Sequence, residues 1–269
     1  MKPMVIALLV LLPLCGWSSK PSPERNVEAA KKVWESVIAA KGGRDRLHAV
    51  RTLGVRLDGG RDWYQLYAFE FPSKVWKRTG PDEPVVKVLD GERGTGAFVG
   101  RHFKKLHSPR KGQVEVSIAA INPENVKLSV EAEVCYAVVH FLLETAWRRP
   151  EIVALDETVR LGKPVLVVYV NDCFGGAAYV IDPVTKLPSE YINFDVRRIG
   201  DKLPPLPQAS RSSVGRLDNY VAIDGIMLPG RTYGREGKMT YEVNRDYPES
   251  LFHTAPTLSD WGLWAPPTK

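Results

Sequence analysis

The protein has 269 residues, of which 44% are hydrophobic and 25% are charged, and its formal net charge is +6. The positive charges are scattered among acidic and apolar neighbours, without a basic stripe interleaved with aromatic residues, so the composition argues against a nucleic-acid partner. The chain is long enough to bury a hydrophobic core without a metal or prosthetic group to support it.

Residues 1–19 have the pattern of an export signal. Lys2 precedes the apolar run Val5–Leu14, which breaks at Cys15. The run is shorter than the roughly 20 apolar residues that a membrane-spanning helix needs, and polar residues follow it soon after. We therefore expect residues 1–19 to be a signal peptide and residues 20–269 to form a single domain in the periplasm.

Cys15 leaves two fates open for the mature N-terminus. A cysteine at the end of an apolar run can be the acylated first residue of a lipoprotein, and Leu12 suits that motif. Pro13 and Leu14 stand where the motif has small residues, which favours ordinary cleavage after Ser18. Cys15 is thus a candidate lipidation site that would attach the protein to a membrane, whereas cleavage after Ser18 would leave a soluble protein.

The mature chain begins with a predicted helix. Ser22 and Pro23 are suited to its N-cap and first position, and Gly42 and Gly43 to its end. Charged residues occupy one face, so we expect the apolar stripe on the other face to pack against a sheet. The residues of this stripe recur at three- and four-residue spacing: Val27, Ala30, Val33, Trp34, Val37 and Ile38.

From Val50 onward the apolar period changes from about 3.6 residues to 2, as in half-buried strands. Turn signals such as Asp90-Gly91 and Asp224-Gly225 separate the alternating segments, so consecutive strands should pair antiparallel. The proline-rich residues 200–213 predict an irregular loop. The expected strands cover residues 53–57, 63–71, 75–79, 85–89, 96–103, 165–170, 178–182, 191–196, 220–223, 231–235 and 238–243.

A strongly apolar helix is expected over Ser129–Arg149, in the middle of this series of strands. We therefore predict a mostly β protein of the α+β class. Its expected form is a curved antiparallel half-barrel of about ten strands, covered by the N-terminal helix and this mid-chain helix. The mid-chain helix either fills the concave face or covers it as a lid.

Large apolar side chains are the candidates for lining the concave face. Alternation places Trp63, Tyr67 and Phe69 on one face of a strand, while Phe141 and Leu142 lie on the apolar helix. Core packing is the ordinary role of such residues, and an open apolar trough is the alternative. These five are the predicted ligand-binding residues.

Cys135 and Cys173 are the cysteines outside the signal region. In an oxidising compartment they can form a disulfide, provided that the helix carrying Cys135 passes the turn at residues 171–176. The alternative is two buried thiols, and the sequence leaves both open.

Sequence motifs of catalysis are missing. The chain has no Gly-x-Ser-x-Gly, no His-Glu-x-x-His and no phosphate-binding glycine loop. His140 and Glu144 stand one helical turn apart, but two ligands without a third do not define a metal site. We expect a non-enzymatic protein with no catalytic residues, no metal and no cofactor.

The segment Ala39–Leu47 joins a Gly-Gly break to a leucine flanked by basic residues, and a strand follows at Val50–Leu53. Further recognisable segments are Phe71–Lys74, Asp90–Arg93, Tyr179–Pro188 and Ile223–Pro229. In this order they resemble the periplasmic proteins related to the outer-membrane lipoprotein-sorting carriers. The resemblance covers most of residues 25–252. It implies an unclosed β-barrel whose concave side accepts acyl chains, and it assigns no binding residue.

Together these features predict a non-catalytic cell-envelope protein that binds a lipid or an acylated protein in an apolar trough. Lipoprotein or lipid transport is the expected process. The alternative is an envelope sensor or interaction scaffold whose trough is filled by its own side chains. The sequence indicates neither the cargo nor the oligomeric state.

Overall fold

The computed structural model describes residues 23–59, 63–81, 85–103, 114–200, 202–208, 214–232 and 237–253. The predicted signal peptide, including Cys15, lies outside these residues. In chain order the elements are α1 (Pro23–Ala40), α2 (Arg44–His48), β1 (Thr52–Asp58), β2 (Trp63–Glu70), β3 (Lys74–Pro81), β4 (Val85–Asp90), β5 (Thr95–Phe103), β6 (Val114–Ala120), α3 (Pro123–Ala137), η1 (Val138–Leu142), β7 (Glu151–Arg160), β8 (Lys163–Asp172), β9 (Gly175–Ile181), β10 (Pro188–Asn193), β11 (Val214–Asp218), β12 (Val221–Ile223), β13 (Ile226–Leu228), β14 (Arg231–Thr232), β15 (Lys238–Val243) and α4 (Ser250–His253).

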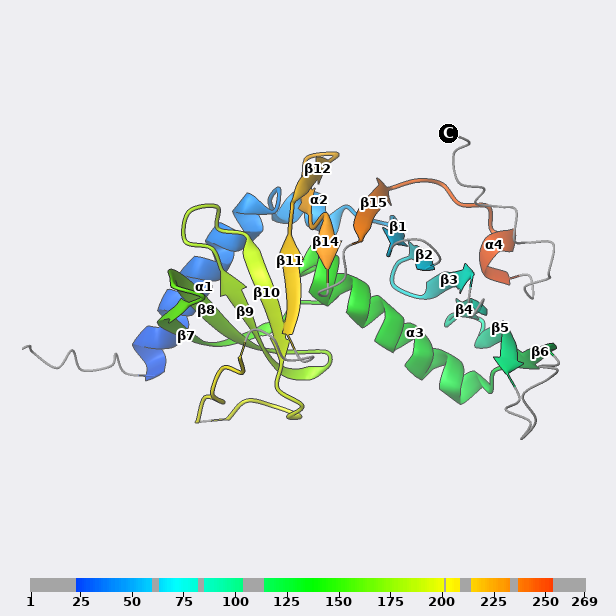
Figure 1. The fold of residues 1–269 in the computed structure, drawn as a ribbon, viewed down its shortest axis with the longest axis horizontal. Coiled ribbons are helices and arrows are strands. Elements are labelled where there is room, and N and C mark those ends of the chain that lie inside the picture. The colour runs from blue at the N-terminus through cyan, green and yellow to red at the C-terminus, as the bar shows by residue number, and fades with distance from the viewer. Residues whose placement is uncertain are drawn as a thin grey trace, which may run out of the picture.

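The strands form two antiparallel sheets and a small ribbon. The first sheet has the order β15-β1-β2-β3-β4-β5-β6, the second β14-β11-β10-β9-β8-β7, and β12 pairs with β13. The sheets approach each other where the Met239 N–H of β15 donates to the Gly230 carbonyl, just before β14. They are not closed into a barrel, and α3 runs between them (Figure 1).

The predicted fold class is therefore confirmed: a mostly β protein with helices and an unclosed antiparallel sheet. The expectation of one continuous sheet of about ten strands is wrong, because the hydrogen-bonded ladder is divided between a seven-stranded and a six-stranded sheet. The strands β6, β7, β11 and β13 were not expected. In β7 a register shift between Ile152 and Ala154 interrupts the alternation on which the strand prediction depends.

Helix α1 begins at Pro23, as its sequence predicts, and packs against β7 and β8. Its apolar stripe is buried, with Trp34 at 3% and Val37 at 0% exposure. Near its start, the Asn26 side chain exchanges two hydrogen bonds with the backbone of Leu155 in β7. Gly42 ends the helix with a φ of 119°, and a Cβ at this position would collide with the Gly225 carbonyl.

Helix α3 differs from the expected Ser129–Arg149 at both ends. It starts earlier, because the Asn122 side chain caps it by accepting from the Glu124 N–H at 3.1 Å. After Ala137 it continues as the π-helical turn η1 and stops at Leu143, whose φ is 71°. The residues beyond turn back on themselves, with the Thr145 N–H donating to the Arg148 carbonyl at 2.8 Å.

One hydrophobic cluster includes side chains from α1, α3, η1 and both sheets. A separate cluster lies on the other face of the first sheet, where Leu251 and Phe252 of α4 pack with Trp76 and Val88. The helices of the described residues include none that is both long and apolar enough to cross a membrane.

Candidate functional site

Four of the five predicted ligand-binding residues lie together in the interior, each at most 4% exposed. They are Tyr67 and Phe69 of β2 and Phe141 and Leu142 of η1. Tyr136 of α3 connects the two groups, because its ring centroid lies 6.1 Å from that of Tyr67 and 5.6 Å from that of Phe141. Trp63 is the first residue of β2, and its side chain lies outside the described residues.

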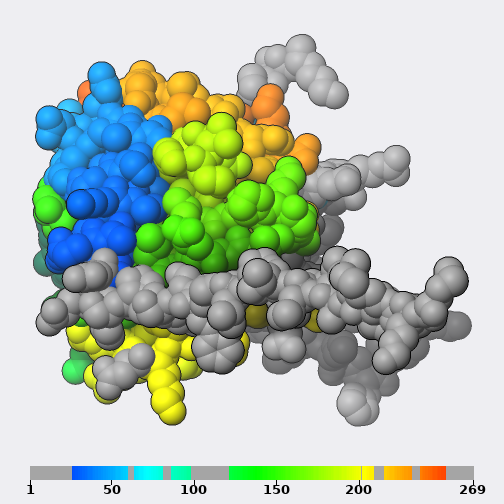
Figure 2. Space-filling view, turned by 90° about the vertical axis from the view of Figure 1, so that its left-hand side faces the viewer, coloured from blue at the N-terminus to red at the C-terminus, as the bar shows by residue number. Residues whose placement is uncertain are grey.

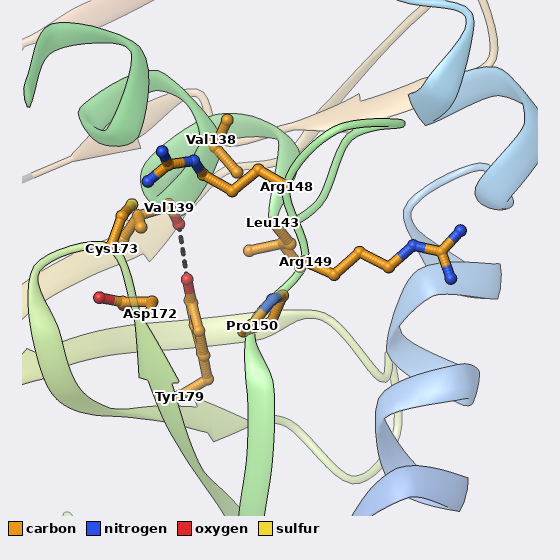
Figure 3. Close-up of a pocket in the computed structure, with 9 residues that line it drawn as sticks. All are labelled: Val138, Val139, Leu143, Arg148, Arg149, Pro150, Asp172, Cys173 and Tyr179. Atoms are coloured by element: carbon orange, nitrogen blue, oxygen red, sulfur yellow. Dashed lines mark hydrogen bonds between the residues drawn. The ribbon is translucent and has the colours of Figure 1, made fainter. Parts of the chain in front are cut away.

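Side chains occupy the concave side of the sheets in the described part of the chain. A gap of about 10 Å³, the space of a single water molecule, lies beside η1 and the β8–β9 turn. Figure 3 shows its lining, in which the Tyr179 hydroxyl donates to the Val139 carbonyl at 3.0 Å. This gap is too small to hold an acyl chain. A separate hollow of about 450 Å³ is lined by residues 42–46, where α1 gives way to α2.

Two kinds of contact hold α3 against the first sheet. Val126, Val130 and Val134 point into the core and are at most 4% exposed. Beside them, the Glu133 carboxylate pairs with the ammonium groups of Lys77 at 3.2 Å and Lys87 at 3.3 Å. These ion pairs are partly exposed, so each is individually weak.

A disulfide holds the other end of α3. Cys135, near the end of the helix, is bonded to Cys173 in the β8–β9 turn, with the two Cα atoms 6.0 Å apart. Of the two states that the sequence left open, the structure has the bridged one. The helix is thus covalently attached to the second sheet, while packing and ion pairs hold it on the first.

A buried lysine lies where α1 ends. Lys41 is 1% exposed, and its ammonium donates to the Phe141 carbonyl at 2.6 Å and to the Met227 carbonyl. The Nζ atom also lies 5.3 Å from the centre of the Tyr220 ring. Burial lowers the pKa of Lys41 to about 7, because the ammonium group loses its hydration in the interior. Lys41 therefore joins the end of α1 to η1 and to β13.

A second polar cluster surrounds Glu144, which is 1% exposed. Its carboxylate accepts from Arg44 Nε at 2.6 Å and from Trp34 Nε1 at 3.4 Å, and it lies 3.1 Å from His48 Nε2. Arg44 also makes a two-bond contact with the exposed Glu35. Burial acts to raise the pKa of Glu144, but Arg44 together with Trp34 and His48 outweighs it, so the pKa lies below its ordinary value.

His140 and Glu144, considered above as metal ligands, serve separate hydrogen-bond networks. His140 Nδ1 lies 3.0 Å from the Tyr136 carbonyl, which identifies this nitrogen as the protonated donor. Burial lowers the pKa of His140 to about 4, so the ring is neutral at pH 7. Among the described residues, no three histidine, cysteine or acidic side chains gather in the manner of a metal site.

The buried role of Lys41 was not predicted from the sequence. The available signal was its spacing, because Lys41 follows Trp34, Val37 and Ile38 at the interval of the apolar stripe and so belongs to the buried face. The cluster around Glu144 carried no such signal. Its partners lie at least 96 positions away along the chain, and only the tertiary fold brings them together.

The site is therefore an apolar, aromatic interior between two sheets that do not close into a barrel. Helix α3, which is covalently attached at one end, covers this interior. Comparison with protein-family models and with characterised proteins finds no match for this chain.

Proposed function

We propose that the protein binds an acyl chain, carried by a lipid or a lipid-modified ligand, inside its half-barrel in the cell envelope. The observation that carries this proposal is the asymmetric attachment of α3. Its C-terminal part is bonded to the second sheet through Cys135, while its N-terminal part lies on the first sheet through Val126 and Val130. The ion pairs of Glu133 with the first sheet lie close to the disulfide, two residues before Cys135. A swing of α3 away from the first sheet would open the apolar interior without disrupting either sheet.

The energetics of this exchange are balanced. Lifting α3 exposes Val126, Val130 and Val134, each costing roughly 1.5–3 kcal/mol when fully transferred to water. An acyl chain that takes their place recovers roughly 0.8 kcal/mol for each buried methylene, so a chain of ordinary length replaces the lost contacts. The closed state buries the same apolar surfaces when no ligand is bound, which keeps them away from water.

The lining of the opened trough would come from the predicted residues. Tyr67 and Phe69 would form one wall on β2, and Phe141 and Leu142 the floor on η1. Lys41 lies next to Phe141 and keeps the position of η1 through its carbonyl contact. Because these contacts are aromatic and aliphatic, they favour a hydrocarbon chain and do not distinguish one headgroup from another.

Binding is tested first on material from the native envelope. The purified protein is extracted with organic solvent and the extract is analysed by mass spectrometry. The delipidated protein is then titrated with a fluorescent polyene fatty acid, and unlabelled palmitate is added as competitor. We expect co-purified lipid and a saturable, competable signal. Absence of lipid together with no uptake by a folded protein would reject the proposal.

A second function is favoured by the filled interior. If α3 never leaves the first sheet, the half-barrel is a scaffold that presents its outer surface to an envelope partner. The small gap beside η1 supports this alternative, because ligand carriers with permanently open pockets enclose far larger volumes. A protein that takes up no fatty acid yet retains its cooperative unfolding would favour the scaffold.

A further inference from the structure

The β7–β8 hairpin ends in an unusual turn. Arg160 pairs with Lys163, so Leu161 and Gly162 form a two-residue loop, with φ angles of 52° and 76°. Two consecutive positive φ angles define a type I′ turn, for which Asn-Gly is the best local sequence. A leucine at the first position is disfavoured by its Cβ, whereas asparagine tolerates this conformation well.

The Leu161 side chain receives no compensation from packing. It is 70% exposed, and the neighbouring Gly162 faces open space. Val159, near the end of β7, is also 70% exposed. The hairpin tip therefore carries apolar side chains where both turn geometry and solvation favour polar ones, which indicates a role outside the fold.

A second turn adds to the same surface. In the β9–β10 turn, the Asp182 carboxylate accepts from the N–H groups of Val184 at 2.8 Å and Thr185 at 2.9 Å. These bonds fix the turn with Val184 pointing outward, 86% exposed. The pairing of Leu166 with Ile181 places this turn beside the start of β8.

The two turns lie on one face of the molecule, where the yellow-green β9–β10 turn adjoins the green β7–β8 surface (Figure 2). Lys163 begins β8, directly after the first turn, and Lys186 belongs to the second turn, two residues after Val184. The pKa of Asp182 lies below its ordinary value, first because of the Thr185 N–H and in part because of the nearby Lys163. Glu157 is an exposed acidic residue of β7, but it lies four residues before Leu161. Four residues of an extended strand span about 13 Å, so this carboxylate is remote from the tip of the hairpin.

We propose that this face, which we call the turn surface (Val159, Leu161, Lys163, Val184 and Lys186), contacts the surface of a phospholipid bilayer. The three aliphatic side chains would enter the boundary between headgroups and acyl chains, and the two lysines would lie at the level of anionic headgroups. A bilayer suits these features because protruding turn tips can insert into lipid. The inference does not depend on acyl-chain binding in the interior.

The test measures co-sedimentation of the full protein with vesicles of phosphatidylethanolamine and phosphatidylglycerol. Leu161→Asn is the informative variant, because it improves the turn and removes the apolar tip. We expect its melting temperature to equal or exceed that of the wild type, and its vesicle partitioning to fall about fivefold. Val184→Thr, which keeps the shape of valine, should also reduce partitioning, and the double variant should bind least.

Leu128→Gln is the matched control, because Leu128 is a comparably exposed leucine on α3, at 64%. It should bind vesicles like the wild type. Fatty-acid uptake should be unchanged in Leu161→Asn, which separates this proposal from the proposed function. Wild-type protein that does not sediment with vesicles, or Leu161→Asn and Val184→Thr variants that bind as well as the wild type, would overturn the proposal.

Discussion

Cys135 and Cys173 connect α3 to the β8–β9 turn, with their Cα atoms 6.0 Å apart and a sequence separation of 38. The bond gives α3 a fixed end on the second sheet. Its other contacts, to the first sheet, are noncovalent. This asymmetry determines which movement of the helix is available.

Removing the disulfide should destabilise the protein substantially. The Cys135→Ser, Cys173→Ser double variant loses a cross-link that closes a loop of moderate length, so we expect the free energy of unfolding to fall by about 3 kcal/mol. Urea unfolding of oxidised wild type and variant measures the difference. A loss below about 1 kcal/mol would mean that the bond contributes little to holding α3.

Neutralising Glu133 should loosen α3 without affecting its packing. Glu133→Gln removes the carboxylate charge with which Lys77 and Lys87 pair. Losing these ion pairs should destabilise the closed position of the helix by roughly 1 kcal/mol. We therefore expect the helix to lift more readily and fatty-acid uptake to become about fivefold faster. Stopped-flow fluorescence measures the rate. Glu131→Gln, at an exposed position of the same helix, is the control and should take up ligand at the wild-type rate.

Lys41 should make stability depend on pH in the alkaline range. Its folded pKa of about 7 lies below the ordinary value of 10.5, so the unfolded chain binds the proton more tightly between these values. The contribution of Lys41 therefore rises as pH increases from about 7 toward 10. Unfolding of wild type and Lys41→Met across this range checks the prediction. Equal pH dependence in the two proteins would contradict it, whatever their absolute stabilities.

His140 should make the stability of the protein depend on pH in the acidic range. The pKa of His140 is about 4 in the folded protein and 6.5 in its ordinary state. The stabilising contribution of the neutral ring is therefore complete above about pH 6.5 and is lost as the pH falls from about 6.5 toward 4. The loss is on the order of 3 kcal/mol. His140→Asn keeps a donor for the Tyr136 carbonyl and removes the titrating ring. Its unfolding midpoint should change less over this pH range than that of the wild type.

Local chemistry explains which parts of the fold could be predicted. Helix α1 followed from Pro23 at its start, its apolar spacing and the glycine pair at its end, all of which act within a few residues. The end of α3 could not be predicted in this way. Leu143 adopts a left-handed conformation without being glycine, and the buried Glu144 beyond it depends on Arg44 and His48 from a distant part of the chain.

The interior shows the same limit. Alternation along β2 correctly placed Tyr67 and Phe69 on one face, because the period of a strand is local. Whether that face is open or filled depends on the position of α3. The disulfide to the second sheet, the three buried valines of α3 and the ion pairs with Lys77 and Lys87 of the first sheet determine this position. No pattern within one segment specifies that relationship.

The most direct test of the account is to lock α3 onto the first sheet. A Cβ built on Gly96 of β5 would lie 2.8 Å from Val126 Cγ2, so the two positions adjoin, and Val126→Cys removes the methyl group that a side chain at position 96 would meet. We therefore choose the Gly96→Cys, Val126→Cys pair for the cross-link. The measurement is fatty-acid uptake by the oxidised double variant, with each single variant as control and thermal unfolding to verify the fold. The account predicts that the locked protein takes up no ligand while both single variants do. Uptake by the locked protein at the wild-type level would contradict the claim that α3 must lift for the interior to accept an acyl chain.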